Sequence, residues 1–357
     1  MNADDSTTIL VDSVTRALGD VLSLGATIQA QADGIDRVAW RQLSALGLVG
    51  EASEQLTLRE MSAIVQAIGQ CGALVPYADS EAMARWLARA AGIASEPSEI
   101  LALSCVSPDL IEAPPQGPAT AVKLAGLQIP WGRLAERLLV AFDRNGGHFV
   151  GVVATRTLAL SHQSNLAGEP ADRCDALSAP FEQVIEVGVP HGPRAVLRRG
   201  ALLRSAAMLG AASRLLDMTI QYAGDRQQFG RSLSQFQVVQ SHIAAMAGEF
   251  AAAGAMFETA LAAQEMGPPE RLTPRPEDGS EIAALKVRIG QAAQVMTSLA
   301  HQVHGAIGFT QEYPLHLWSR RLWAWREEYG NEAQWAAELG ATMLAIGADD
   351  FWTRMTR

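Results

Sequence analysis

Apolar residues recur every three or four positions over most of this chain, which is the spacing of one face of an α-helix. This spacing predicts helices in residues 6–95 and again from about residue 193 to the end. Between these regions the chain is rich in Pro and Gly, and short apolar runs predict strands at residues 100–103, 121–124, 138–142, 149–153 and 183–187. The pattern therefore predicts a helical region, a small β region and a second helical region.

Local signals place some of the element ends. Thr57 with Glu60 three residues later is typical of a capping box, which predicts the start of a helix over residues 58–69. Gly47 is expected to end a helix over residues 38–46. Asn145 and Gly146 are turn residues between two of the predicted strands.

Long helices joined mostly by short loops predict an antiparallel four-helix bundle in the last part of the chain. Their expected ranges are 194–223, 235–266, 281–304, 314–326 and 332–352. The predicted fold is α+β and mostly α. Its predicted domains are an N-terminal helical domain, a middle β domain and a C-terminal helical bundle domain, over residues 1–96, 97–192 and 193–357.

Composition excludes several classes of partner. The chain has 357 residues and a net charge of -10, which argues against a nucleic acid held by phosphate contacts. No apolar run of about 18 residues without charges predicts a membrane span. The three scattered cysteines predict neither a disulfide framework nor a metal site. The polar, acidic start is unlike a secretory or transit peptide, and we expect a cytoplasmic protein.

Two glycine-containing segments carry the candidate chemistry. The first runs from Arg226 to Gly230 and reads RQQFG; the second runs from Gln302 to Gly308 and reads QVHGAIG. A guanidinium matches a diphosphate with a fork of donors, and a Phe ring offers a flat face to a purine. Main-chain N–H groups bared by small residues at Gly305 and Ala306 can also hold a diphosphate. Each segment alone also fits an ordinary helix end with a packed side chain.

Together, and in this order, the two segments resemble those of the acyl-CoA dehydrogenase family of flavoproteins. The resemblance implies the fold given above, FAD as cofactor and an acyl-CoA thioester as substrate. It implies that the first segment reaches FAD across a subunit interface. The implied FAD-binding residues are Arg226, Gln228, Phe229, Gln302, Gly305 and Ala306. It also implies that Trp131 flanks the isoalloxazine ring, with a core tryptophan as the alternative.

The catalytic base is where the sequence departs from this family. The reaction needs a carboxylate that removes the proton α to the thioester while the β-hydrogen leaves as hydride. An ungapped count from the second segment puts Tyr329 at the position of the usual Glu, and Gly200 stands at the position used by a few other members. Glu328 is the candidate base, Glu327 the alternative, and Glu249 and Glu312 are weaker candidates. Both Glu327 and Glu328 also fit a solvated acidic pair near the start of the last helix.

A third explanation is that an associated subunit supplies the base. The short chain is similar to the small subunits of heteromeric acyl-CoA dehydrogenases of bacterial steroid degradation. This similarity implies either a homo-oligomer or a heterotetramer with a second acyl-CoA dehydrogenase chain, and an electron-transfer flavoprotein as electron acceptor. The alternatives left open are a non-catalytic subunit that completes the FAD site of a partner, and a helical assembly protein without flavin.

Overall fold

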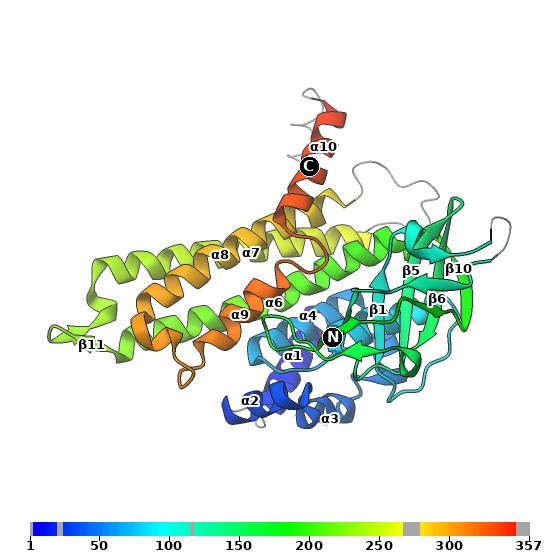
Figure 1. Cartoon of the computed structure of the whole chain (residues 1–357). Coiled ribbons are helices and arrows are strands. Elements are labelled where there is room, and N and C mark those ends of the chain that lie inside the picture. Colours follow the sequence, from blue (N-terminus) through cyan, green and yellow to red (C-terminus); the bar gives the residue numbers. More distant parts are fainter. Residues whose placement is uncertain (1–2, 20–23, 115–117, 267–278, 348–357) are drawn as a thin grey trace. The chain divides into compact units, whose positions relative to one another are not determined.

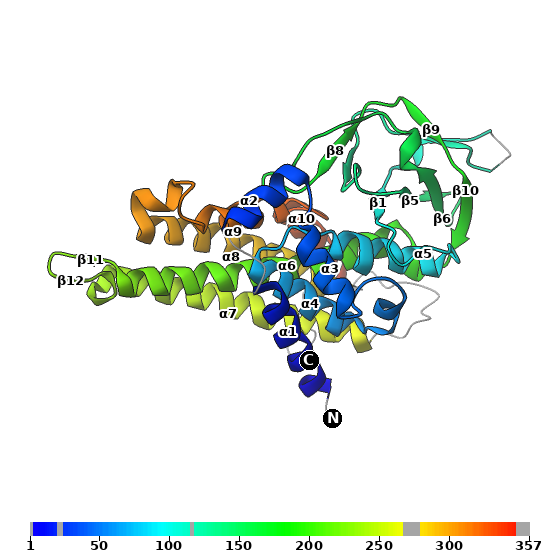
Figure 2. The same cartoon turned by 90° about the horizontal axis from the view of Figure 1, so that it is seen from below.

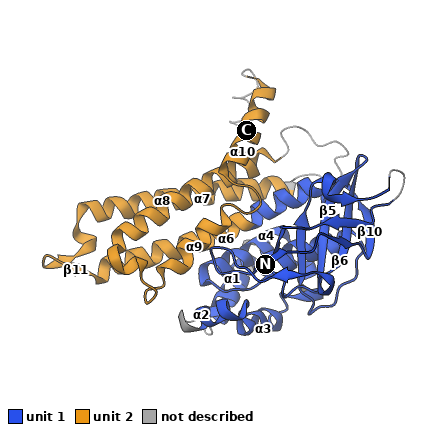
Figure 3. Cartoon of the chain, in the orientation of Figure 1, with its two compact units in different colours: residues 1–203 blue, residues 204–357 orange. Residues whose placement is uncertain are grey.

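The computed structural model describes residues 3–19, 24–114, 118–266 and 279–347. Its chain divides into two compact units, Met1–Leu203 and Arg204–Arg357 (Figure 3). The long helix α6 (Pro193–Asp225) begins in the first unit and ends in the second. Helices, then strands, then helices follow each other in the predicted order, and the mostly helical α+β fold is confirmed. The division into three domains stays a prediction.

The first unit begins with helices, because its apolar positions keep the helical spacing. They are α1 (Ala3–Gly19), α2 (Leu24–Asp33), α3 (Arg37–Ala45), α4 (Leu58–Cys71), the π-helical segment Tyr77–Arg85 and α5 (Trp86–Ala90). The predicted capping box of α4 is confirmed. The side chain of Thr57 accepts from the N–H of Glu60 at 3.2 Å, and the carboxylate of Glu60 accepts from the N–H of Thr57 at 2.8 Å.

Replacing Thr57 with alanine is expected to lower the free energy of unfolding by about 1 kcal/mol, because the first turn of α4 loses its cap. Chemical denaturation followed by circular dichroism measures this change. Thr259→Ala is the matched control, because the hydroxyl of Thr259 bonds only back to Ala255 in the exposed middle of a helix. Equal losses in the two variants would contradict a capping role for Thr57.

The strands of the first unit form small sheets. The largest has the order β1-β5-β6-β10, with β1 (Leu101–Cys105) parallel to β5 (Arg137–Arg144), and with β6 (Gly147–Ala154) antiparallel to both β5 and β10 (Gln183–Val187). The first unit also has two three-stranded sheets, with the strand orders β2-β3-β9 and β4-β8-β7. Their strands are short: Ile111–Glu112, Ala121–Lys123, Gln128–Pro130, Leu160–Ser161, Ala171–Cys174 and Ser178–Pro180.

The hairpin between β5 and β6 follows directly from the sequence. Arg144 pairs with Gly147, so Asn145 and Gly146 form a two-residue turn. Both turn residues have positive φ, 51° and 82°, which Asn and Gly adopt more readily than other residues. Strand β5 then contributes buried apolar side chains on both of its faces: Leu138, Val140 and Phe142 on one, and Leu139 and Ala141 on the other.

The second unit is helical apart from one short hairpin among its described residues. It contains the end of α6, then α7 (Gln237–Met266), α8 (Ser280–His304), α9 (Leu315–Trp325) and α10 (Glu332–Ile346). Helix α8 contacts α7, α9 and α10, and Figures 1 and 2 show α7 and α8 side by side. The loop predicted at residues 267–279 and the end predicted for the last helix, residues 348–352, lie outside the described residues, except for Gly279.

Candidate functional site

The first candidate segment is a short hairpin that follows α6. Strand β11 (Gln227–Gln228) pairs with β12 (Arg231–Ser232), and Phe229 and Gly230 form the turn with φ values of 52° and 78°. A positive φ at a bulky residue such as Phe229 is uncommon and costs on the order of 1 kcal/mol or more. The ring of Phe229 is nevertheless 92% exposed. A strained aromatic residue in open solvent suits a binding partner better than a core position.

Arg226 stands at the root of this hairpin. Its main chain is fixed, because its N–H donates to the carbonyl of Tyr222 and its own carbonyl accepts from Leu233, both at 2.9 Å. The side chains of Arg226 and Gln228 are exposed. The hairpin therefore holds a guanidinium, an amide and an aromatic ring outward on an ordered backbone.

The second candidate segment follows α8. Gln302 is exposed on the last turn of the helix, and Gly305 ends it with a φ of 61°. Residues Gly305–Phe309 then form a 3₁₀ turn. Ala306 is exposed and is not among the residues with positive φ, so its methyl group causes no backbone strain. Gly305 is also exposed, but its N–H donates to the carbonyl of His301.

Both segments lie at one end of the second unit. The ring of Tyr222, at the end of α6, stacks on the ring of His304, at the end of α8, with 4.4 Å between the ring centroids. The hydroxyl of Tyr222 donates to the carbonyl of His304 at 3.4 Å. Figures 1 and 2 show the β11 hairpin and the end of α8 on the same side of the bundle. The contact between Tyr222 and His304, which are 82 residues apart in the chain, thus places the two segments at the same end of the second unit.

Trp131 lies in the first unit and is buried. Its indole is 2% exposed and packs in an apolar cluster with Ala30 and Leu74. The indole N–H donates to the carboxylate of Asp79 at 2.9 Å. The next side chain but one, that of Arg133, is anchored by the fully buried carboxylate of Asp172 at 2.6 Å. These contacts favour the core alternative for Trp131.

Glu328, the candidate base, is engaged in an ion pair. Its carboxylate lies 2.8 Å from Nε of Arg204 on α6, and the two side chains are 29% and 6% exposed. Glu327 points to solvent with 61% of its side chain exposed, and it accepts from the side-chain amide of Asn331 at 3.2 Å. A proton on Glu328 would leave the guanidinium of Arg204 without its counter-charge. The position of Glu328 therefore suits a structural ion pair with Arg204 better than the role of a catalytic base.

A buried lysine completes this arrangement and was not predicted. Lys286 on α8 is 1% exposed, and its ammonium group donates to the carbonyls of Trp325, Arg326 and Glu328, with 2.9 Å to the last. Burial lowers the pKa of Lys286 to about 8, against the opposing pull of the Glu328 carboxylate. The helical spacing held a signal for it, because position 286 falls on the same face as the apolar residues Ile282 and Ile289.

The weaker candidate bases are not better placed. Glu249 on α7 forms an ion pair with Arg288 on α8, and Glu312 is exposed in the loop before α9. Trp318 and Trp325 on α9 are packed, since they are 7% and 4% exposed. Among the candidate carboxylates, Glu328 is the one that forms an ion pair with a buried arginine.

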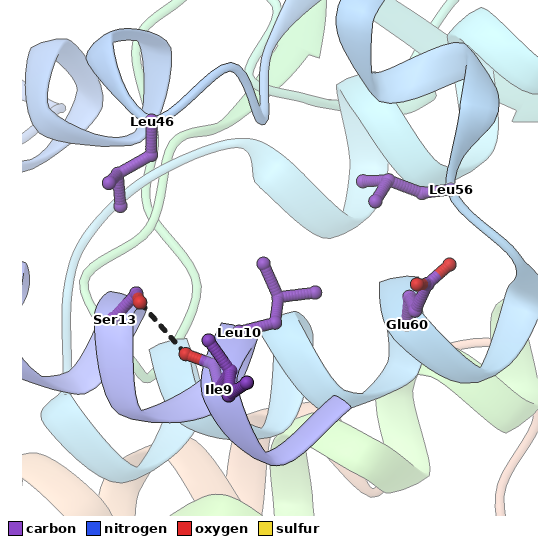
Figure 4. A pocket seen from close by; sticks show the side chains of 6 residues that line it. All are labelled: Ile9, Leu10, Ser13, Leu46, Leu56 and Glu60. Carbon is purple, nitrogen blue, oxygen red and sulfur yellow. Dashed lines mark hydrogen bonds between the residues drawn. The ribbon is translucent and has the colours of Figure 1, made fainter. Parts of the chain in front are cut away.

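A hollow in the first unit carries no further chemistry. Figure 4 shows its lining residues: Ile9, Leu10, Ser13, Leu46, Leu56 and Glu60. The hydroxyl of Ser13 donates to the carbonyl of Ile9 at 2.8 Å, and the carboxylate of Glu60 belongs to the capping box of α4. Across the described residues, no cluster of His, Cys, Asp and Glu side chains could hold a metal ion, and no helix is long and apolar enough to cross a membrane.

Known proteins resemble this chain in sequence and in fold. A sequence model of the acyl-CoA dehydrogenase C-terminal domain matches residues 193–334. Glutaryl-CoA dehydrogenase of Desulfococcus multivorans is 31% identical over 183 residues, which are 50% of this chain and 44% of the relative. The chain thus spans less than half the length of this curated relative.

Solved structures share the fold over nearly the whole chain. The Tcur3481-Tcur3483 steroid ACAD G363A variant superposes with a TM-score of 0.82 at 21% identity, covering 96% of this chain and 99% of that one. The ChsE4-ChsE5 complex from Mycobacterium tuberculosis gives a TM-score of 0.79 at 19% identity, covering 96% and 98%. At these identities the likeness concerns the fold.

Proposed function

We propose, from the premise that the chain belongs to the acyl-CoA dehydrogenase family, that it is a subunit of an FAD-dependent enzyme that removes the α and β hydrogens of an acyl-CoA thioester. The observation that carries the proposal is that the Arg226–Gly230 hairpin and the Gly305–Phe309 turn lie at one end of the second unit, where Tyr222 and His304 connect the helices that precede them. Each supplies groups that suit a dinucleotide, and neither is covered by its own chain.

The exposed residues fit the adenosine-diphosphate part of FAD. Arg226 offers a forked, permanently charged donor to the diphosphate, and Phe229 offers a bare ring to the purine. Gly305 and Ala306 are small and exposed, so they leave room for a phosphate beside the turn, with Gln302 and Gln228 as further polar contacts. When bound, FAD supplies a hydride acceptor for the β-hydrogen. We do not assign Trp131 to the flavin, because its indole is buried among core residues.

The surroundings of Glu328, the candidate base, favour a second candidate function, that of a subunit without a catalytic base of its own. If Glu328 served as base, it would have to leave the buried guanidinium of Arg204 each time it accepted a proton. The ion pair favours instead a subunit that helps to hold FAD and depends on an associated chain for the carboxylate. The preferred form of the proposal is therefore that this chain helps to bind FAD and that the associated chain supplies the catalytic base.

The partners follow from the same proposal. One structural relative is a steroid ACAD variant named after two proteins, Tcur3481 and Tcur3483, and the other is the ChsE4-ChsE5 complex. This supports a heterotetramer with a second acyl-CoA dehydrogenase chain more than a homo-oligomer. It also supports a bulky, steroid-type acyl group as substrate, with an electron-transfer flavoprotein as electron acceptor.

Co-purification tests the flavin site and the partner together. The chain is produced alone and together with any acyl-CoA dehydrogenase-like chain that is encoded next to it, and flavin absorption per chain is measured. We expect the pair to be yellow and to retain more FAD per chain than this chain alone. A colourless preparation that FAD does not reconstitute, either alone or with the second chain, would favour the flavin-free assembly protein instead.

A further inference from the structure

His304 lies on the last turn of α8, directly before the turn assigned to the flavin diphosphate, and is 3% exposed. Its Nδ1 lies 2.8 Å from the carbonyl oxygen of Ala300, which can only accept, so Nδ1 carries the proton. Its Nε2 lies 3.3 Å from the hydroxyl of Tyr313 and accepts from it. The neutral imidazole thus uses both of its nitrogens.

The same side chain is connected to the hairpin. Tyr222 stacks on the imidazole and donates to the carbonyl of His304. Tyr222 precedes Arg226 by one helical turn, and its carbonyl accepts the N–H of Arg226 at 2.9 Å. A displacement of His304 therefore reaches the root of the hairpin that carries Arg226 and Phe229.

The Gly305–Phe309 turn after α8 packs against the side chain of His304. Gly308 is buried, and a Cβ atom at this position would lie 3.0 Å from Cβ of His304 and 3.3 Å from Nδ1 of His301. The ring of Phe309 lies against the ring of His301, with 4.5 Å between the centroids. The turn is therefore packed directly on the two histidines, with no space for a larger residue at 308.

We propose that neutral His304 is a positioning residue that holds the Arg226–Gly230 hairpin and the Gly305–Phe309 turn in one arrangement for FAD, and that its protonation releases both segments together. The importance of this arrangement for FAD rests on the proposed function. The coupling between the two segments rests only on the contacts of His304.

The electrostatics of the cluster give the direction of the pH dependence. Titratable and charged groups face it from α6, α8, the loop before α9, and α9: Arg214, Tyr222, Asp225, His301, Tyr313 and His316. Burial lowers the pKa of His304 below its ordinary value of 6.5, and His301 lowers it further, while the bond to Ala300 opposes the shift. As pH falls below about 6.5, the unfolded or loosened chain binds more protons than the ordered one, so the ordered arrangement loses stability.

Two readouts test the coupling at about pH 7.5 and about pH 5.5. Hydrogen exchange of the flavin-free protein reports on the amides of residues 227–232 and 305–313, and fluorescence quenching gives the dissociation constant of FAD for the assembled protein. We expect both segments to lose protection together at the lower pH, and the FAD dissociation constant to rise about tenfold. His304→Gln keeps an acceptor near the position of Nε2 without titrating, and should flatten both dependences. His242→Gln, a histidine of α7, is the matched control and should change neither.

The outcomes separate the coupling from the flavin proposal. A His304→Gln protein with the pH dependence of the wild type, or loss of protection in one segment alone, would overturn the coupling. A chain that binds no FAD at either pH, but whose two segments still loosen together, would overturn the flavin site and support the coupling. If His304→Gln does not fold, Tyr313→Phe removes only the hydroxyl that donates to Nε2. It should reduce protection in both segments at the higher pH, and unchanged protection would count against the proposal.

Discussion

Replacing Arg226 with leucine is expected to raise the dissociation constant of FAD roughly 10- to 150-fold, because a charged, forked hydrogen bond to a phosphate contributes about 1.5–3 kcal/mol. The side chain is exposed and its main chain is held by Tyr222 and Leu233, so the free energy of unfolding should hardly change. Titration of FAD into the assembled protein, followed by flavin fluorescence, measures the effect. Arg226→Lys keeps the positive charge but loses the forked pair of donors, so its dissociation constant for FAD should lie between those of the wild type and of Arg226→Leu.

Arg231 provides a matched control on the same hairpin. It is also exposed and also cationic, but its guanidinium lies 4.1 Å from the centroid of the Phe236 ring and not at the root of the hairpin. We expect Arg231→Leu to change FAD affinity by less than about threefold. If both arginine variants lost affinity equally, the hairpin would act through its total charge, and the specific assignment of Arg226 to the diphosphate would be lost.

The sequence predicted the elements whose signals are local. The capping box at Thr57 and Glu60, the turn at Asn145 and Gly146, and the strand Gln183–Val187 each depend on residues a few positions apart, and all three were predicted correctly. Among the short strands of the two small sheets, Ala121–Lys123 was predicted and the others were missed, because such short runs carry no periodicity that distinguishes them from loops. The sequence predicted helical structure for residues 77–85, but not that this segment, Tyr77–Arg85, is a π-helix.

In the candidate site, too, features with local sequence signals were predicted and features that depend on tertiary contacts were not. The two candidate segments could be recognised because small, basic and aromatic residues stand at fixed short spacings, and their binding of flavin stays a prediction. Whether Glu328 is free depends on Arg204, which lies 124 positions earlier and meets it only through tertiary packing. The coupling of the segments through Tyr222 and His304 likewise joins positions 82 residues apart. No short-range pattern in one sequence reports such contacts, and only the unusual Lys286 on an apolar helix face hinted at a buried polar network.

Removing the charge of Glu328 can decide its role. Loss of a structural ion pair lowers stability, whereas loss of a general base lowers turnover. Glu328→Gln is expected to lower the free energy of unfolding by about 3 kcal/mol near neutral pH, since Arg204 and Lys286 would be left as neighbouring buried cations. Turnover per bound flavin in the assembled enzyme should stay within about tenfold of the wild type. A general base would instead account for a loss of about 100-fold or more.

The pH dependence of this variant gives an independent test. Burial already lowers the pKa of Lys286 to about 8, and the carboxylate of Glu328 is the first charge that opposes the shift. Above that pH the folded protein has released a proton that the unfolded chain still holds, so stability rises with pH and the penalty of a buried ammonium disappears. Without Glu328 the pKa of Lys286 falls further, so the stability difference between Glu328→Gln and the wild type should narrow as the pH rises toward about 8 and stay small above it. Glu327→Gln is the control, because its exposed carboxylate should contribute less than about 1 kcal/mol at every pH. A stability difference for Glu328→Gln that does not depend on pH, together with lost turnover, would make Glu328 the base of this chain.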